Sequence, residues 1–114
     1  MALSLETDYH VGPNDISISI VIGDAQLGTS LLKLDEEEIK RGDNIQDFKI
    51  GNGPQLTSKT LSIKTVVTDV NDKTNHTSVT YKLKGGSQDS DFHLDGSVDS
   101  EGDSLIYRAK FNFV

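Results

Sequence analysis

The chain contains no cysteine. Disulfide bonds, thiolate catalysis and cysteine-ligated metal sites are therefore excluded. The absence does not decide the compartment, because many exported β-domains fold without disulfides. At 114 residues the chain is long enough for one domain, which would bury roughly two-thirds of its unfolded surface without such cross-links.

Basic residues are scarce as well. Lys and Arg number 11 against 18 Asp and Glu, so the formal net charge is −7 at pH 7. Nucleic acids and anionic membranes bind clustered Lys and Arg, and neither is expected as the main partner. The negative charge favours solubility and suits a cation or a basic protein surface as a partner.

Long apolar runs are missing from the sequence. The longest apolar stretch is far shorter than the roughly 20 residues that cross a bilayer, so we expect no membrane insertion. Glu6, Asp8 and His10 interrupt the start of the chain, and for this reason we also expect no signal peptide.

Catalytic signatures are absent too. The sequence has neither the Gly-x-Ser-x-Gly elbow of hydrolases nor the Gly-x-x-x-x-Gly-Lys phosphate loop. His10, His76 and His93 lack the close spacing of a zinc site. His93 alternates with Phe92 and Leu94, which predicts that its side chain faces solvent. We therefore do not expect an enzyme.

The chain is rich in segments whose apolar residues alternate with polar ones. This period of two is typical of strands with one face on a core and one face in water. The clearest segments, with their expected core residues, are 16–22 (Ile16, Ile18, Ile20, Ile22), 77–84 (Thr77, Val79, Tyr81, Leu83) and 104–114 (Leu105, Tyr107, Ala109, Phe111, Phe113).

Residues 58–86 predict a long antiparallel hairpin. The first half is dense in β-branched residues, which suit a pleated surface better than a helix. The second half alternates cleanly. Between them, Asn71 and Asp72 can open a turn, because their side chains bond their own backbone and tolerate unusual backbone angles.

Further strands are expected over residues 2–11, 25–34 and 45–50. The last of these is short, charged and flanked by glycine, which favours a sheet edge. Residues 35–41 favour a helical turn, since acidic residues come first and basic residues last. The pattern predicts an all-β, single-domain antiparallel β-sandwich of about seven to eight strands, with a small β-barrel as the alternative.

Two stretches resemble a known family. Residues 94–107 contain Leu-Asp-Gly-Ser, Asp-Ser-Glu-Gly-Asp and Leu-Ile-Tyr, and residues 66–72 contain Val-Thr-Asp-Val-Asn. Both are similar to motifs of polycystic-kidney-disease-type and related bacterial immunoglobulin-like domains, although the family has them in the opposite order. The resemblance implies an immunoglobulin-like sandwich that serves as a module of surface or secreted proteins. It therefore favours an extracellular or cell-surface location slightly over a cytoplasmic one.

Residues 85–103 contain six carboxylates and neither Lys nor Arg. Ca²⁺ takes six to eight oxygen ligands, and carboxylates two apart on a loop can converge on it. Asp95, Asp99, Glu101 and Asp103 are therefore the candidate ligands of a calcium site, although their spacing does not fit an EF-hand loop. A solvated acidic loop that keeps a β-protein soluble is the alternative.

We expect a non-catalytic interaction or structural module of a cell-surface or secreted assembly, with a protein as its partner. Strand addition at the edge segment 45–50 is the expected mode of contact. The alternative is a β-domain that binds a small ligand or Ca²⁺. A small hydrolase that uses the acidic cluster is the least favoured hypothesis.

Overall fold

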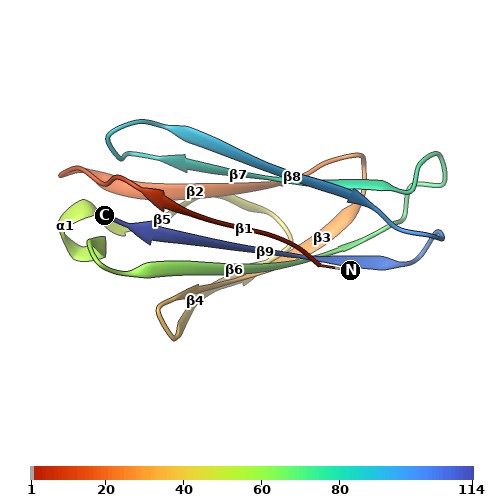
Figure 1. The fold of residues 1–114 in the computed structure, drawn as a ribbon, viewed down its shortest axis with the longest axis horizontal. Coiled ribbons are helices and arrows are strands. Elements are labelled where there is room, and N and C mark those ends of the chain that lie inside the picture. Colours follow the sequence, from red (N-terminus) through yellow and green to blue (C-terminus); the bar gives the residue numbers. More distant parts are fainter. Residues whose placement is uncertain (1) are drawn as a thin grey trace.

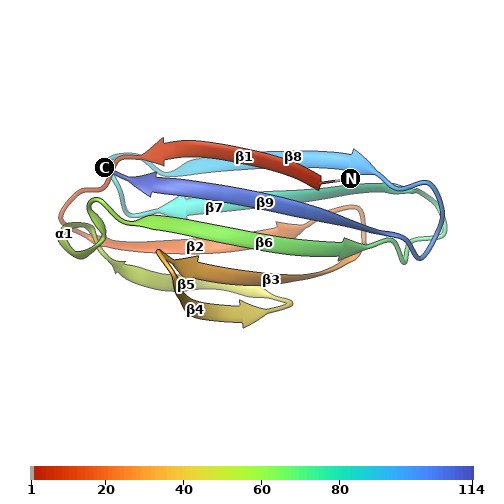
Figure 2. The same ribbon diagram turned by 60° about the horizontal axis from the view of Figure 1, so that its bottom comes forward.

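The computed structural model describes residues 2–114, which form nine strands and one short helix. Two sheets pack face to face, one with the strand order β1-β9-β6-β3-β4 and one with the order β5-β2-β7-β8 (Figures 1 and 2). The strands are β1 (Ala2–Tyr9), β2 (Asp15–Ile22), β3 (Leu27–Leu34), β4 (Glu37–Gly42), β5 (Ile45–Asn52), β6 (Thr60–Thr68), β7 (His76–Lys84), β8 (Ser90–Ser97) and β9 (Ser104–Phe113), and the helix is α1 (Gly53–Leu56).

The predicted all-β sandwich is confirmed, and the arrangement is not a closed barrel. The strand count was too low by at least one, because the helical turn predicted over residues 35–41 is wrong. Residues 37–42 form β4, which pairs with β3 through a turn in which Asp35 has a φ of 53°. A helix this short is unstable alone, whereas a strand beside β3 gains ladder hydrogen bonds.

The hairpin predicted over residues 58–86 is also wrong. Both strands exist, but β6 pairs with β3 and β9, whereas β7 pairs with β2 and β8. Residues 69–75 therefore cross from one sheet to the other (Figure 1). Alternation within a segment predicts a strand, but it carries no information about which strand lies beside it.

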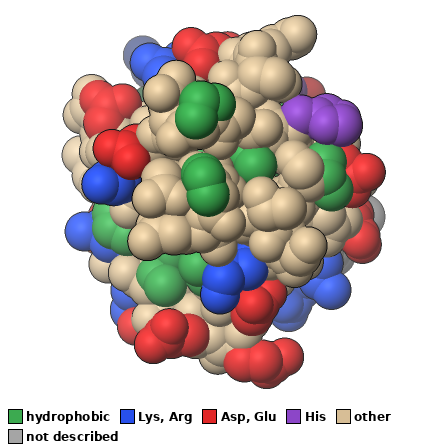
Figure 3. Space-filling view, turned by 90° about the vertical axis from the view of Figure 1, so that its left-hand side faces the viewer, with side chains coloured by type: hydrophobic (Ala, Val, Ile, Leu, Met, Phe, Trp, Pro, Cys, Tyr) green, Lys and Arg blue, Asp and Glu red, His purple; other side chains and the backbone are tan. Residues whose placement is uncertain are grey.

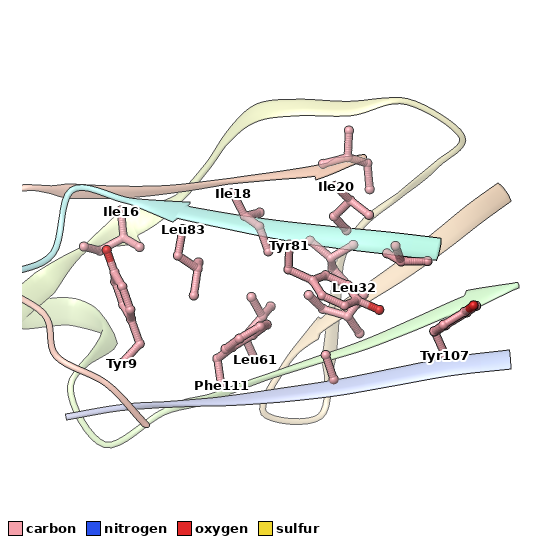
Figure 4. Packing of buried hydrophobic residues seen from close by; sticks show 14 of the residues in the cluster. Tyr9, Ile16, Ile18, Ile20, Leu32, Leu61, Tyr81, Leu83, Tyr107 and Phe111 are labelled. Carbon is pink, nitrogen blue, oxygen red and sulfur yellow. The ribbon is translucent and has the colours of Figure 1, made fainter. Parts of the chain in front are cut away.

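The core lies between the sheets and contains the residues that alternation predicted. Ile16, Ile18 and Leu83 of the four-stranded sheet point toward Leu61 and Phe111 of the five-stranded sheet (Figure 4). All five apolar residues that were expected to face inward on β9 are buried. Ile22 is the exception on β2, because it is only partly buried at the end of its strand.

α1 fills the connection between β5 and β6. Asn52 caps it, since the Asn52 side chain accepts a hydrogen bond from the Gln55 amide at 2.9 Å and the Gln55 side chain accepts one from the Asn52 amide at 3.2 Å. With only four residues, α1 is far too short to cross a bilayer, and no helix in residues 2–114 is long and apolar enough to do so.

The sheet edges are each protected from pairing with another strand. β5 is an edge strand, as predicted, but two register shifts interrupt its pairing with β2, and Asp47 has a φ of 49°. β4 is short and charged. β1 and β8 lie beside each other, with the Leu3 side chain close to Gly96 (Figure 2). Bulges, short length and charge all disfavour strand addition.

Candidate functional site

Two loops meet at one end of the sandwich and carry most of the predicted site residues. We call residues 69–75 and 98–103 the acidic tip (Figure 1, right-hand end). The Asp69 amide donates to the Asp103 carbonyl at 2.9 Å, and the Gly102 amide donates to the Asp69 carbonyl at 2.8 Å. These bonds join the two loops. Asp99, Glu101 and Asp103 are exposed there, whereas Asp95 lies on the solvent-facing side of β8.

The candidate calcium ligands are not gathered into a recognisable site. Residues 2–114 contain no group of three or more His, Cys, Asp or Glu side chains that could hold a metal ion. Asp103 Oδ2 instead accepts a hydrogen bond from the Ser100 amide at 3.2 Å, which stabilises its own turn. Calcium binding at Asp95, Asp99, Glu101 and Asp103 stays a prediction.

One buried side chain fixes the shape of the acidic tip. Gln26 is 7% exposed, and its Oε1 accepts hydrogen bonds from the Val70 amide at 2.8 Å and the Asn71 amide at 2.9 Å. Its Nε2 donates to the carbonyls of His76 at 3.0 Å and Thr74 at 3.4 Å. Because Gln26 satisfies four backbone groups, the crossing from β6 to β7 needs no further secondary structure.

Asp69 is buried beside this network. Its Oδ1 accepts a hydrogen bond from the Asn71 amide at 3.2 Å, and its Oδ2 has no hydrogen-bond partner within residues 2–114. No described ion pair involves Asp69. Within residues 2–114 the Asp69 carboxylate therefore accepts one hydrogen bond, from the Asn71 amide.

Two histidines and two carboxylates form a row on the outer face of β7 and β8. His76 Nδ1 lies 3.0 Å from Asp24 Oδ2, and His76 Nε2 lies 3.8 Å from Asp95 Oδ1. Asp95 Oδ2 lies 3.3 Å from His93 Nε2. All four side chains are at least partly exposed, and His93 faces solvent as its alternation with Phe92 and Leu94 predicted. His93 and Asp95 share a face because they are two residues apart on β8, whereas Asp24 and His76 join them only through the fold.

The outer side of the five-stranded sheet carries a cluster of cations. Lys33, Lys64, Arg108 and Lys110 are exposed on β3, β6 and β9, where their strand neighbours point into the core. We call these four residues the basic face. None lies within 4.0 Å of a carboxylate of the described chain, since the Lys and Arg ion pairs involve Arg41, Lys49 and Lys59.

The basic face also has a stability cost. Lys64 and Arg108 are directly opposite each other on the neighbouring strands β6 and β9. Like charges in this position repel, and the pair costs roughly 0.2–1 kcal/mol compared with a neutral one. Acidic residues occur only at the flanks of this sheet, on β1 and β4, and none faces outward from β3, β6 or β9.

Apolar side chains lie between the basic face and the acidic tip. The register places Thr29, Val66 and Ile106 in one row across the sheet, next to the row that contains Lys64 and Arg108. Val66 and Ile106 are only partly buried. Leu27, in the following row, is 64% exposed. The outer side of this sheet therefore combines an apolar centre with positive charge on one side.

A groove of about 830 Å³ adjoins this apolar centre, because Leu27, Thr29 and Val66 are among the residues that line it. It is bounded by β2, β3 and the beginning of β5. Its apolar walls include Val21 and Leu27, its cations are Lys82 and Lys84, and its carboxylates are Asp43 and Asp47. The volume falls within the roughly 300–1,000 Å³ of small-molecule sites.

The end of the molecule opposite the acidic tip is different in character. Viewed end-on, its centre is mostly uncharged, and charged side chains of both signs lie around the rim (Figure 3). The basic face is thus a local cluster of cations on one sheet, whereas carboxylates occur toward both ends of the molecule, at the acidic tip and in residues 35–38 beside the start of β6. Alternation in the sequence placed only Arg108 and Lys110 on a common face, and Lys33 and Lys64 join them through strand pairing.

No family model, curated protein or solved structure matches this chain. The resemblance to polycystic-kidney-disease-type domains accordingly stays a prediction.

Proposed function

We propose that this protein is a non-catalytic interaction module that binds an acidic protein surface through the basic face. The observation that carries the proposal is the cross-strand pair of Lys64 and Arg108. A sheet gains nothing in folding from two cations in direct opposition, and the two have no carboxylate within ion-pair distance in the described chain. A partner's carboxylates would remove this repulsion and gain charge-assisted hydrogen bonds.

An acidic protein suits this face better than a nucleic acid does. The cations span three strands, which is roughly 10 Å, because neighbouring strands are about 4.8 Å apart. Carboxylates on β1 and β4 flank them, so an extended polyanion would meet negative charge on either side. The described part of the basic face also has no exposed aromatic ring on which a base could stack.

A sheet face replaces the sheet edge as the proposed contact surface. The bulges of β5 and the charge of β4 disfavour the strand addition that the sequence suggested. The wider setting that we propose, an assembly at the cell surface or outside the cell, rests on the resemblance of residues 66–72 and 94–107 to immunoglobulin-like modules.

The test is titration with a short poly-glutamate peptide, followed by amide chemical shifts. We expect shifts at Lys64, Arg108 and their neighbours, and at least tenfold weaker binding to Lys64→Glu. The fold should survive, because Glu opposite Arg108 turns a repulsive pair into an attractive one worth roughly 0.5 kcal/mol.

The matched control is Lys49→Glu, which makes the same charge change at an exposed position on β5 of the other sheet, outside both the basic face and the groove. It should bind the peptide nearly as the parent chain does. If both variants lost peptide affinity equally, the binding would depend on net charge alone and the proposal would fail. Amide chemical-shift changes centred on any other face would also refute it.

A second candidate function is binding of a small amphiphilic anion in the groove. The observation that favours it is the combination of exposed Val21 with Lys82 and Lys84 along its walls. We expect the dye 1-anilinonaphthalene-8-sulfonate to shift the amides of β2 and β3 and to fluoresce when bound.

Val21→Glu should abolish this binding, because it places a carboxylate in the apolar wall. Val114→Glu is the control, since Val114 is 45% exposed, close to the 46% of Val21, but lies outside the groove. Dye binding that is unchanged in Val21→Glu would dismiss the groove as a site.

A further inference from the structure

We propose that the acidic surface bound by the basic face belongs to a second copy of this chain, in a two-fold symmetric dimer. The inference rests on the proposed function and names its partner. The two outer sides of the five-stranded sheets face each other, and the strands of the two copies run in opposite directions. Val66 and Ile106 lie close to the two-fold axis.

The order of rows along the sheet carries this inference. Ile106 is followed by Arg108 and Lys110 on the same side of β9. Because a strand rises about 3.4 Å per residue, these cations lie roughly 7 and 14 Å from the apolar row. In the opposite direction, Ser104, the first residue of β9, lies about 7 Å from the apolar row. The acidic tip lies directly before it and includes Asp103.

A two-fold axis that runs along the apolar row, across the strands, brings opposite charges of the two copies together. Rotation about it carries the tip of one copy over the rows of the other copy that contain Lys64, Arg108 and Lys110. The tip supplies exposed Asp72, Asp99, Glu101 and Asp103 against the single cation Lys73. Each copy thus offers a basic and an acidic region on opposite sides of the axis, which is the self-complementarity that a two-fold interface requires.

The centre of the same surface supplies apolar contact. Val66 and Ile106 are partly buried in the isolated chain, and Leu27, in the neighbouring row, is 64% exposed. Two sheets can pack face to face about 10 Å apart when such side chains interdigitate. An acidic foreign protein would explain the cations but would leave the arrangement of the tip without a role.

The test is sedimentation equilibrium from micromolar to millimolar concentration at low salt. We expect a mass that approaches twice the 12.4 kDa of one chain. In 1 M salt, where charges are screened over roughly 3 Å, association should be weaker. Val66→Lys places two cations close to the axis and should leave the chain monomeric.

A charge-swap experiment isolates the pairing of tip and face. Lys64→Glu and Glu101→Lys should each weaken the dimer about tenfold or more, because each places like charges in contact. Mixing the two variants, or combining both changes in one chain, should restore it, since every contact again joins opposite charges. Lys49→Glu, on β5 of the other sheet, should associate as the parent chain does.

Several outcomes would overturn the inference. The first is a chain that stays monomeric at every concentration, and the second is a dimer that Val66→Lys does not weaken. The third is a dimer that Lys64→Glu weakens but Glu101→Lys does not. A monomer that still binds poly-glutamate through the basic face would refute the dimer alone. A chain that neither dimerises nor binds the peptide would refute the proposed function as well.

Discussion

Replacement of Gln26 by Leu is expected to lower the free energy of unfolding by about 3 kcal/mol. The Gln26 side chain serves four backbone groups of the crossing between β6 and β7, and Leu can serve none of them. An unsatisfied buried polar group costs roughly 1–3 kcal/mol. The total for the four backbone groups stays near the upper end of that range, because Val70 is 47% exposed and water can reach part of the crossing. Urea unfolding at neutral pH measures the loss.

The matched control is Gln46→Leu. Gln46 is exposed on β5, and no described hydrogen bond uses its side chain, so a change within about 0.5 kcal/mol is expected. Amide exchange should also accelerate selectively in residues 69–75 of Gln26→Leu. A loss below about 1 kcal/mol, or one matched by the control, would show that water replaces the Gln26 side chain at no cost.

Stability is expected to fall steeply as the pH rises above 10. Burial raises the pKa of the Tyr81 hydroxyl to about 12 from its ordinary 10.0, and it raises the pKa of Tyr9 and Tyr107 in the same direction. Below pH 10 each hydroxyl is protonated whether the chain is folded or not. Between pH 10 and 12 the unfolded chain loses the proton while the folded chain keeps it, which favours unfolding.

The contribution of Tyr81 alone is about 1.4 kcal/mol at pH 11 and approaches about 2.7 kcal/mol above pH 12, because one pKa unit corresponds to 1.36 kcal/mol. Tyr81→Phe removes this contribution. The measurement compares urea unfolding of the two chains from pH 8 to pH 11. The lysines lose their charge equally in both, so the difference between the curves belongs to Tyr81.

Tyr81→Phe should also leave stability unchanged or slightly raised at neutral pH. No hydrogen bond of good geometry reaches the buried Tyr81 hydroxyl within residues 2–114, and the nearby Thr65 hydroxyl keeps its own bond with Ser30 at 2.7 Å, so removal of the Tyr81 hydroxyl leaves no other group unpaired. Parallel pH curves for the two chains would contradict the assignment of a raised pKa to this side chain.

The candidate sites were only partly accessible from the sequence. Asp99, Glu101 and Asp103 were identified because they are adjacent in the chain, and the structure places them together at the acidic tip. The basic face was missed for the opposite reason. Lys33, Lys64 and Arg108 are far apart in the chain, and an overall charge of −7 conceals a local cluster of the other sign.

The sequence by itself determined which residues face the core. On β7 and β9 the apolar side chains alternate, and a pleated strand sends alternate side chains to opposite faces whatever lies beside it. That rule depends only on neighbours along the chain. It therefore held for β7, the second strand of the segment 58–86, even though the predicted pairing of that segment was wrong.

Only the tertiary structure decided which strands are partners. Ladder hydrogen bonds join backbone groups that are nearly the same in every residue, so a strand's own pattern does not select its neighbour. The selection comes from the sum of packing between the sheets and from contacts such as those of Gln26, which hold residues 69–75 in their crossing. The basic face and its position relative to the acidic tip follow from that selection, because strand register alone aligns Lys64 with Arg108.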